Sequence, residues 1–248
     1  MKIKEIIIIG ILTVVLIYAL YKLISGITRS SSEIGSPIYY ARSKYHKQTK
    51  NSYIKLIFNS GVRGEYLLYK ELDDYEPEKK KYIFNAYIPT SDGRTSEIDL
   101  MMFYRNHIFV FENKNLSGEI CGKVNDKKWS VITRSRKYDL YNPIWQNNGH
   151  IKALKGLVGD YYFDSMISFR DFTKITVYDE NGEPFGCSVI KNCNIVDYRN
   201  VIQATVNIAA YKPPRITDKE MEDIYGKLKI YEDVETKVKL KHRKEEGF

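Results

Sequence analysis

Asp99, Glu112 and Lys114 are the residues of this chain whose types and spacing point most directly to chemistry. They stand at the ends of two apolar, aromatic-rich runs, Ile98–Tyr104 and His107–Phe111, which predict the two strands of a β-hairpin. Residues two apart in a strand share a face, so Glu112 and Lys114 point to the same side. The hairpin therefore predicts that two carboxylates and one ammonium group converge.

A two-residue turn at Arg105 and Asn106 sets the register of this hairpin. Asp99 then lies directly opposite Glu112, with Cβ atoms roughly 4.5–5.5 Å apart, and like charges at that separation repel each other. A hard cation such as Mg²⁺ would relieve this repulsion, because it prefers carboxylate oxygens. The pair is therefore a candidate metal site.

The same register leaves a structural interpretation open. Lys114 lies opposite Glu97 and can form an ordinary cross-strand ion pair, while Asp99 and Glu112 can lie on a solvated face. The D-x12-E-x-K spacing is loose enough to recur by chance. The hairpin alone does not decide between the two interpretations.

Composition favours a single domain with an anionic partner. The chain has 248 residues, a net charge of +8 and a pI near 9.1, a balance typical of proteins that contact nucleic acid or lipid headgroups. The basic residues are spread along the chain, so part of this charge reflects general residue usage. Cys121, Cys187 and Cys193 are odd in number and lack metal-ligand spacing, which favours a reducing compartment and argues against a disulfide framework or a zinc site.

The N-terminal segment is uncharged from Ile6 to Leu20 and apolar almost to Ile24. This length is close to the ~20 residues that a bilayer core requires, which predicts an uncleaved transmembrane anchor. A signal peptide cleaved near Ser25–Gly26 is the alternative. More basic residues follow the segment than precede it, which places the remainder of the chain in the cytoplasm of a single-pass cell-membrane protein.

The other predicted elements alternate between helices and strands, which indicates an α/β layer arrangement. Asn142 is the expected N-cap of a helix that begins at Pro143, and Thr217 with Glu220 forms a capping-box pattern. The polar stretch Ser30–Pro37 reads as a linker. The predicted helices are Arg63–Leu72, Pro143–Val158 and one that begins at Thr217; the predicted strands are Tyr82–Ile88, Ser117–Gly122, Lys128–Thr133, Thr173–Val177, Cys187–Ile190 and Ile195–Asp197.

Several segments, taken together and in this order, resemble the NERD (nuclease-related) domain, which is grouped with the PD-(D/E)XK nucleases. The resemblance covers roughly residues 60–156. It implies a restriction-endonuclease-like fold, a mixed central sheet flanked by helices, here preceded by the transmembrane helix. The segments are Gly61–Glu65 (GVRGE), Thr95–Asp99 (TSEID), Phe109–Lys114 (FVFENK), Ser117–Gly118, Trp129 and Asn142–Asn147 (NPIWQN).

The resemblance also implies a role for each matching residue. Asp99 and Glu112 would bind Mg²⁺ or Mn²⁺, and the backbone carbonyl of Asn113 would complete the site. Lys114 would orient the attacking water or stabilise the charged phosphorane. Glu65 would touch the metal or a water bound to it, and Gln146 would support the site from the following helix. The family usually has an apolar residue where this chain has Asn113, a side chain that strand period turns away from the site.

Other interpretations of the supporting residues stay open. Glu65 can be a carboxylate favoured by the dipole of its helix, and Gln146 can be a surface residue. We expect Trp129 and Trp145 to pack rather than to stack on bases. The basic and aromatic stretch Arg134–Tyr141 can follow a nucleic-acid backbone or form a solvated loop.

The sequence thus predicts a membrane-anchored, Mg²⁺-dependent nuclease that acts on DNA at the cytoplasmic face. A non-catalytic scaffold that binds nucleic acid or membrane is the alternative, as is an endoribonuclease. The expected divisions are a transmembrane segment (1–26), a linker and juxtamembrane region (27–59), a NERD-like core (60–160), the C-terminal part of the same domain (161–230) and a charged tail (231–248).

Overall fold

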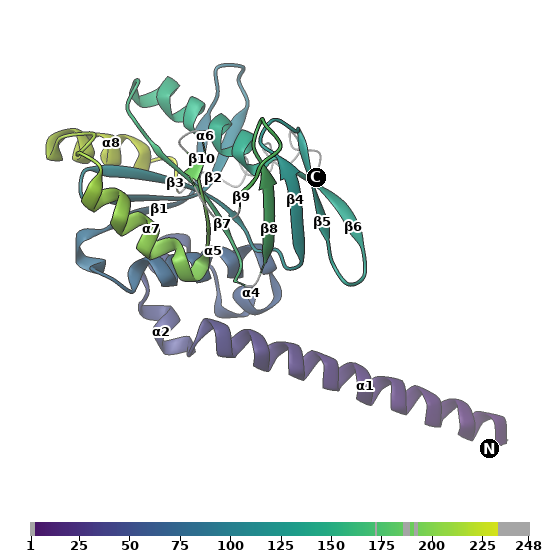
Figure 1. The fold of residues 1–248 in the computed structure, drawn as a ribbon. Helices are drawn as coiled ribbons and strands as arrows, with labels where there is room; N and C mark the ends of the chain where they lie inside the picture. Colours follow the sequence, from purple (N-terminus) through teal and green to yellow (C-terminus); the bar gives the residue numbers. More distant parts are fainter. Residues whose placement is uncertain (1–2, 172, 186–188, 191–192, 233–248) are drawn as a thin grey trace.

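Two mixed β-sheets form the centre of this protein, and helices pack around them in the computed structural model (Figure 1). The structure describes residues 3–171, 173–185, 189–190 and 193–232. The helices in these ranges are α1 (Ile3–Ile34), α2 (Pro37–Arg42), α3 (Lys44–Thr49), α4 (Tyr53–Phe58), α5 (Ser60–Asp73), the 3₁₀ turn η1 (Pro77–Lys79), α6 (Pro143–Val158), α7 (Tyr198–Tyr211) and α8 (Asp218–Lys229).

The larger sheet has the strand order β1-β2-β3-β7-β11-β10. Strand β3 pairs antiparallel with β2 on one side and parallel with β7 on the other, so the predicted hairpin lies inside the sheet. Its strands are β1 (Lys81–Pro89), β2 (Thr95–Tyr104), β3 (His107–Lys114), β7 (Asp164–Phe169), β10 (Val189–Ile190) and β11 (Cys193–Asp197).

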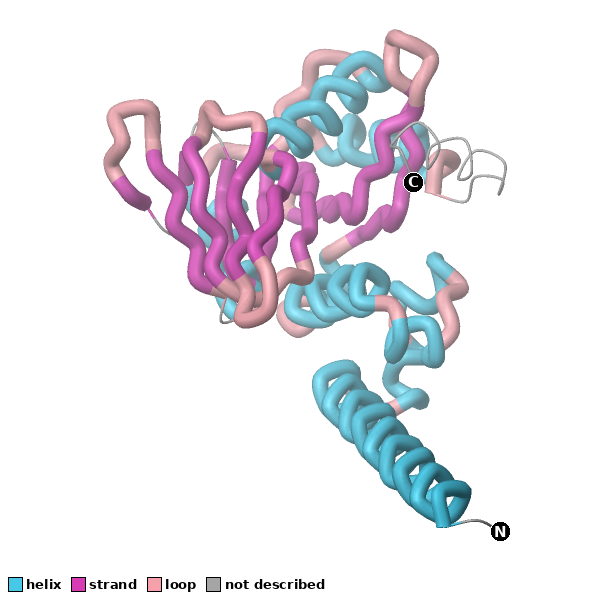
Figure 2. The backbone as a smooth tube through the Cα atoms, turned by 90° about the vertical axis from the view of Figure 1, so that its right-hand side faces the viewer, coloured by secondary structure: helices cyan, strands magenta, loops and turns pink. Residues whose placement is uncertain are grey.

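The smaller sheet has the order β6-β5-β4-β8-β9 and stands beside the larger one (Figure 2). One of its faces packs Ile120, Trp129 and Val131 against Ile167 and Phe169 of β7. Its strands are β4 (Glu119–Lys123), β5 (Lys128–Ile132), β6 (Lys137–Tyr141), β8 (Lys174–Tyr178) and β9 (Pro184–Phe185).

Side chains from both faces of the larger sheet are buried. Leu100 and Met102 of β2 face a core shared with α5 and α7, whereas Met101 and Phe103 face a second core shared with α6 and α8. Successive side chains of a strand point to opposite faces, so a strand with helices on both sides is apolar at every position. This explains why residues 100–104 of β2 form a continuous apolar run.

The predicted hairpin is confirmed. Tyr104 pairs with His107, and both turn residues have positive φ, 48° at Arg105 and 63° at Asn106. Two such residues define a type I′ turn, whose twist matches that of the flanking strands. The boundaries of α6 and the capping box at Thr217 are also as predicted.

The sheet arrangement differs from the expected single central sheet in two ways. Strand β7 lies between β3 and β11, yet its sequence predicts no strand, because three of its six residues are polar: Asp164, Ser165 and Ser168 are all buried. Residues 137–141, one candidate for a solvated loop, form strand β6. Tyr138 and Leu140 of that strand pack toward the core of the smaller sheet.

The N-terminal region also differs from expectation. Helix α1 continues through the expected linker to Ile34, which is buried in the core, and Gly35 ends it with φ of 90°. Among the residues whose side chains the structure describes, no helix has both the length and the apolar character of a membrane span. The predicted anchor at Ile6–Leu20 is therefore not supported; the side chains of residues 1–10 lie outside this description.

The first two residues of the expected charged tail, Tyr231 and Glu232, contact strand β1. The backbone N–H of Tyr87 donates to the Tyr231 carbonyl at 3.0 Å, and the N–H of Phe84 donates to the Glu232 carboxylate at 2.8 Å. These bonds satisfy donors on β1, the edge strand of the larger sheet, and cover an edge that would otherwise be open to pairing. Residues 233–248 lie outside the described part of the chain.

Candidate active site

Glu112 is the centre of a buried polar cluster at the end of β3. Its side chain is 2% exposed. The Lys114 ammonium contacts one carboxylate oxygen, and His150 Nε2 on α6 donates to the other at 2.9 Å. Lys114 Nζ also donates to Gln146 Oε1 at 3.0 Å. The predicted cluster thus includes Glu112, Lys114 and Gln146.

Asp99 joins this cluster from β2. The β2–β3 ladder ends with Leu100 opposite Phe111, and one further step of the same register sets Asp99 opposite Glu112, as predicted. The backbone N–H of Asn113 donates to Asp99 at 2.8 Å. The Asn113 side chain points away, to Tyr198 and Ser168, in agreement with strand period.

The electrostatic environment shifts the pKa values of Asp99 and Glu112 in opposite directions. Burial raises the pKa of Asp99 well above its ordinary value, and the charges of Glu112 and Glu65 add to this effect. Burial alone would also raise the pKa of Glu112, but Lys114 and His150 together hold it below the ordinary value. Glu112 is therefore the stable anion of the pair, and Asp99 is the group that most needs a further cation.

Glu65 completes the acidic side of the cluster from α5. Its carboxylate accepts from Tyr45 Oη at 2.8 Å and from Asn85 Nδ2 at 3.1 Å. Asn85 stands in register with Asp99 but has a left-handed φ of 49°, and the ladder is interrupted at this pair. This local distortion of β1 directs an amide toward Glu65.

Gly64 allows α5 to approach the end of β3 closely. A Cβ atom at this position would overlap the Asn115 side chain and meet the Asn113 amide at 3.1 Å. Only glycine avoids this overlap, because it has no Cβ. The second glycine of the GVRGE segment therefore has a packing reason that also places Glu65 beside the site.

Glu65 is expected to make stability depend on pH. Burial raises its pKa from 4.5 to about 7, so the folded state keeps this proton to a higher pH than the unfolded chain does. The free energy of unfolding should therefore fall as pH rises from about 4.5 to about 7. Glu65→Gln keeps an acceptor for Tyr45 and should flatten this fall between pH 5 and pH 8 in urea denaturation. Glu78→Gln changes an exposed residue and should leave the wild-type fall in the free energy of unfolding unaltered. If Glu65→Gln also leaves that fall unaltered, Glu65 is not the group that causes it.

His150 is a residue of this cluster that was not predicted from the sequence. Its ring links two elements, because Nε2 donates to Glu112 while Nδ1 lies 2.6 Å from Ser96 Oγ on β2. A signal was present, since His150 follows Gln146 by four residues, and residues four apart share one face of a helix. Spacing along the chain does not reveal the partner of this histidine, because that partner is a carboxylate on another element.

His150→Ala should lower the free energy of unfolding by about 1–3 kcal/mol. The buried Glu112 would lose a hydrogen-bond donor and keep its desolvation cost. His150→Gln retains a donor and should recover part of the loss in urea denaturation. Lys152→Ala changes an exposed residue of the same helix and is the matched control; equal losses in His150→Ala and Lys152→Ala would show that the buried bond has no stabilising role.

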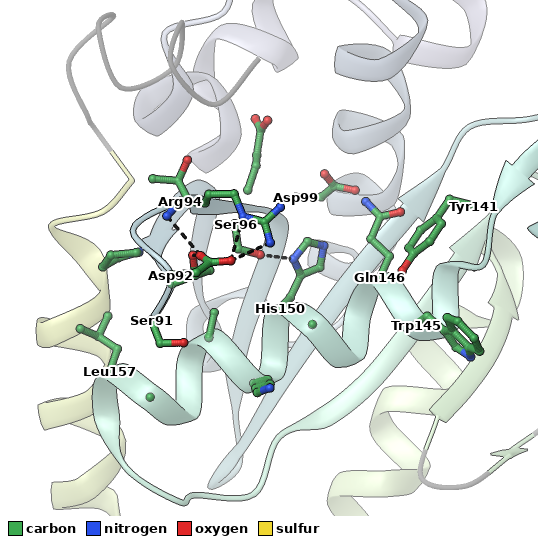
Figure 3. A pocket seen from close by; sticks show the side chains of 18 residues that line it. Ser91, Asp92, Arg94, Ser96, Asp99, Tyr141, Trp145, Gln146, His150 and Leu157 are labelled. Atoms are coloured by element: carbon green, nitrogen blue, oxygen red, sulfur yellow. Dashed lines mark hydrogen bonds and ion pairs between the residues drawn. The ribbon is translucent and has the colours of Figure 1, made fainter. Parts of the chain in front are cut away.

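A cleft of about 1010 Å³ opens beside this cluster, between α6 and the β1–β2 connection (Figure 3). Asp99, Gln146 and His150 line it next to the cluster, and Tyr141 and Trp145 line one end. The remaining walls are residues 89–92 and 94–97, together with residues 149, 152, 153, 156 and 157 of α6. A ligand in this cleft would thus reach Asp99, behind which the buried Glu112 lies.

The donor chemistry of the cluster fits a hard divalent cation. Among the residues described, no group of three or more His, Cys, Asp or Glu side chains forms a ready metal site. Asp99 and Glu112 nevertheless repel each other, and Asp99 has its pKa raised for that reason as well as by burial. Carboxylate oxygens are preferred ligands of Mg²⁺, which usually keeps several waters and so needs only one or two carboxylates.

Comparison with known proteins agrees with the resemblance in the sequence. Residues 60–170 match the family model of NERD, the nuclease-related domain. The chain is also 24% identical over 188 residues to an uncharacterized protein of Bacillus anthracis, which covers 74% of this chain and 82% of that relative. No solved structure matches the chain.

Proposed function

We propose that this chain is a divalent-metal-dependent nuclease that hydrolyses phosphodiester bonds, with DNA as its expected substrate. The observation that carries the proposal is the convergence of Glu112 and Lys114, at the end of β3, with Asp99 of β2. All three lie within residues that match the nuclease-related domain. A buried acidic pair beside an open cleft is costly to a fold. A catalytic cation bound between the two carboxylates would offset their repulsion and would explain why the fold retains them.

The residues of the cluster divide the chemistry among them. Asp99 and Glu112 would hold Mg²⁺ or Mn²⁺, with the Asn113 carbonyl completing the set and Glu65 nearby. Once bound, the cation would activate water and shield phosphate charge.

Lys114 supplies a fixed positive charge where negative charge develops on the phosphate oxygens. Gln146 holds its ammonium group through the 3.0 Å bond, and His150 holds the Glu112 carboxylate from the opposite side. The lysine is therefore held beside the proposed metal ligands.

A cleavage assay with the full chain tests this proposal. Single-stranded DNA, duplex DNA and RNA should be incubated with Mg²⁺, with Mn²⁺ and with EDTA. We expect cleavage of DNA that requires the metal. Absence of cleavage of all three substrates by wild-type protein in either metal would overturn the proposal.

The same assay separates the alternatives. A non-catalytic scaffold would bind nucleic acid and leave it intact, whereas an endoribonuclease would cut only the RNA. The scaffold is less favoured, because a binding module has no need for the mutually repelling Asp99 and Glu112 in its interior.

We also propose that helix α1 attaches the protein to the cytoplasmic face of the cell membrane. The helix projects from the domain (Figures 1 and 2), and its apolar side chains from Ile11 to Leu20 are largely exposed. Exposed apolar surface of this extent is typical of contact with lipid or protein. A cysteine introduced at Ser36 should resist membrane-impermeant thiol reagents in intact cells, and ready labelling would reverse the orientation.

A further inference from the structure

Tyr141 and Trp145 form an exposed aromatic pair at one end of the cleft. These residues are 46% and 40% exposed, whereas Trp129, the other tryptophan, is 1% exposed in the core. Both line the cleft that Asp99 and Gln146 also line, and Figure 3 shows Gln146 between Asp99 and the aromatic pair. Trp129 is packed in the core as expected, whereas Trp145 is only partly covered.

The corner that carries this pair is fixed by hydrogen bonds. Asn142 lies between strand β6 and helix α6 and is fully buried. Its amide donates to the Val124 carbonyl at 3.0 Å and the Asp126 carbonyl at 2.7 Å, and its Oδ1 caps the helix by accepting from the Ile144 N–H at 2.9 Å. The backbone on both sides of Asn142 is therefore held against the β4–β5 turn.

The indole of Trp145 is itself anchored. Its Nε1 donates to the Val124 carbonyl at 3.0 Å, which satisfies the polar atom of the ring while much of its apolar surface remains in contact with water. A ring that is already held in place loses little conformational freedom when a flat ligand stacks on it. Burial of such a large side chain is favourable, so an anchored but exposed indole indicates a ligand.

We propose that Tyr141 and Trp145 are a stacking platform for unpaired bases, so that this site takes single-stranded nucleic acid or frayed ends. This inference rests on the proposed function for the neighbouring acidic cluster. Stacking on aromatic side chains requires bases released from a duplex, and it tolerates any base because every base has a π-face. A strand whose bases stack here would have its backbone directed along the cleft toward Asp99.

Basic side chains in the same cleft fit that path. Lys152 is exposed on α6, and Arg94 lies across the cleft on the β1–β2 connection, with its guanidinium 2.7 Å from Asp92. These cations can contact phosphates. They would contribute affinity that falls with salt, whereas the aromatic pair contributes affinity that depends little on salt.

Tryptophan fluorescence of the full chain tests the platform directly. Acrylamide should quench Trp145, which is exposed, and leave the buried Trp129 largely unaffected. Saturating oligo(dT) or oligo(U), added with Ca²⁺ so that turnover does not consume it, should protect Trp145 from quenching, and a blunt duplex should not. In Trp145→Phe, the fluorescence that acrylamide quenches and the oligonucleotide protects should be absent. Equal protection by the duplex, or protection by neither oligonucleotide, would overturn the proposal.

Binding to variants supplies the second measurement. Trp145→Ala should weaken single-strand binding roughly tenfold, within the range measured for loss of one base–aromatic stack, with an unchanged salt dependence and less than a twofold effect on blunt duplex. Tyr211→Ala, which removes an aromatic ring that is 86% exposed on α7, is the control and should change neither.

Cleavage assays on the same proteins distinguish a failure of the stacking platform from a failure of the nuclease assignment. Cleavage by wild type with no effect of Trp145→Ala on either substrate would refute the platform and leave the nuclease assignment standing. Protected Trp145 without cleavage in any metal would refute the nuclease assignment alone.

Discussion

Replacing Asp99 with asparagine is expected to abolish metal-dependent cleavage while the free energy of unfolding stays level or rises. The amide side chain would offer a neutral oxygen where a cation needs a charged one. The raised pKa of Asp99 means that its ionised form is disfavoured in the folded state, so this carboxylate costs stability at any pH above its unfolded pKa. Cleavage and urea denaturation at pH 8 measure the two effects.

Asp160→Asn is the matched control, because it makes the same change at an exposed residue paired with Lys155 and not among those that line the cleft. It should leave cleavage within about twofold of wild type. Cleavage by the Asp99→Asn protein at the wild-type rate would end the metal-site assignment.

The structure reverses the expected stability effect at Glu112. The hairpin alone predicts that removing either carboxylate relieves repulsion. Glu112 is instead the buried acceptor for Lys114 and His150. Glu112→Gln should therefore abolish cleavage and also cost about 1–3 kcal/mol, because buried donors lose a charged partner.

Lys114→Ala should lower the single-turnover rate by about 10²–10³-fold with little change in substrate affinity. This is the range for loss of one donor that stabilises transition-state charge, and an effect on rate without an effect on binding identifies an interaction made only in the transition state. The measurement is single-turnover cleavage with saturating enzyme, paired with a binding titration in Ca²⁺.

Two further variants separate catalysis from structure. If Lys114 were only the cross-strand partner of Glu97, Glu97→Ala would produce a similar small loss of stability, about 1 kcal/mol or less, with normal turnover in both. Lys174→Ala removes an exposed lysine paired with Glu119 and sets the baseline for a surface ion pair. Normal turnover in Lys114→Ala would leave this lysine a structural residue.

The sequence alone determined the parts of this protein whose signals are local. The alternation and turn around Arg105 and Asn106 predicted the hairpin, its register and the meeting of Glu112 with Lys114, because strand period and turn type act over a few residues. Asn142 and Thr217 marked two helix starts for the same reason, since a cap satisfies N–H groups within its own turn.

Only the tertiary structure decided which distant elements meet. Strand β7 pairs parallel with β3 although Asp164 and Ser168 interrupt its apolar pattern, because polar groups are tolerated inside a fold when distant partners satisfy them. Such partners leave no periodic trace in the sequence. The bond from His150 to Glu112 spans 38 residues, and the bonds from Tyr45 and Asn85 to Glu65 each span 20. The hairpin that carries Asp99 and Glu112 could therefore be predicted from the sequence. The positions of His150 and of the aromatic pair could not, because they depend on how α6 packs against the sheet.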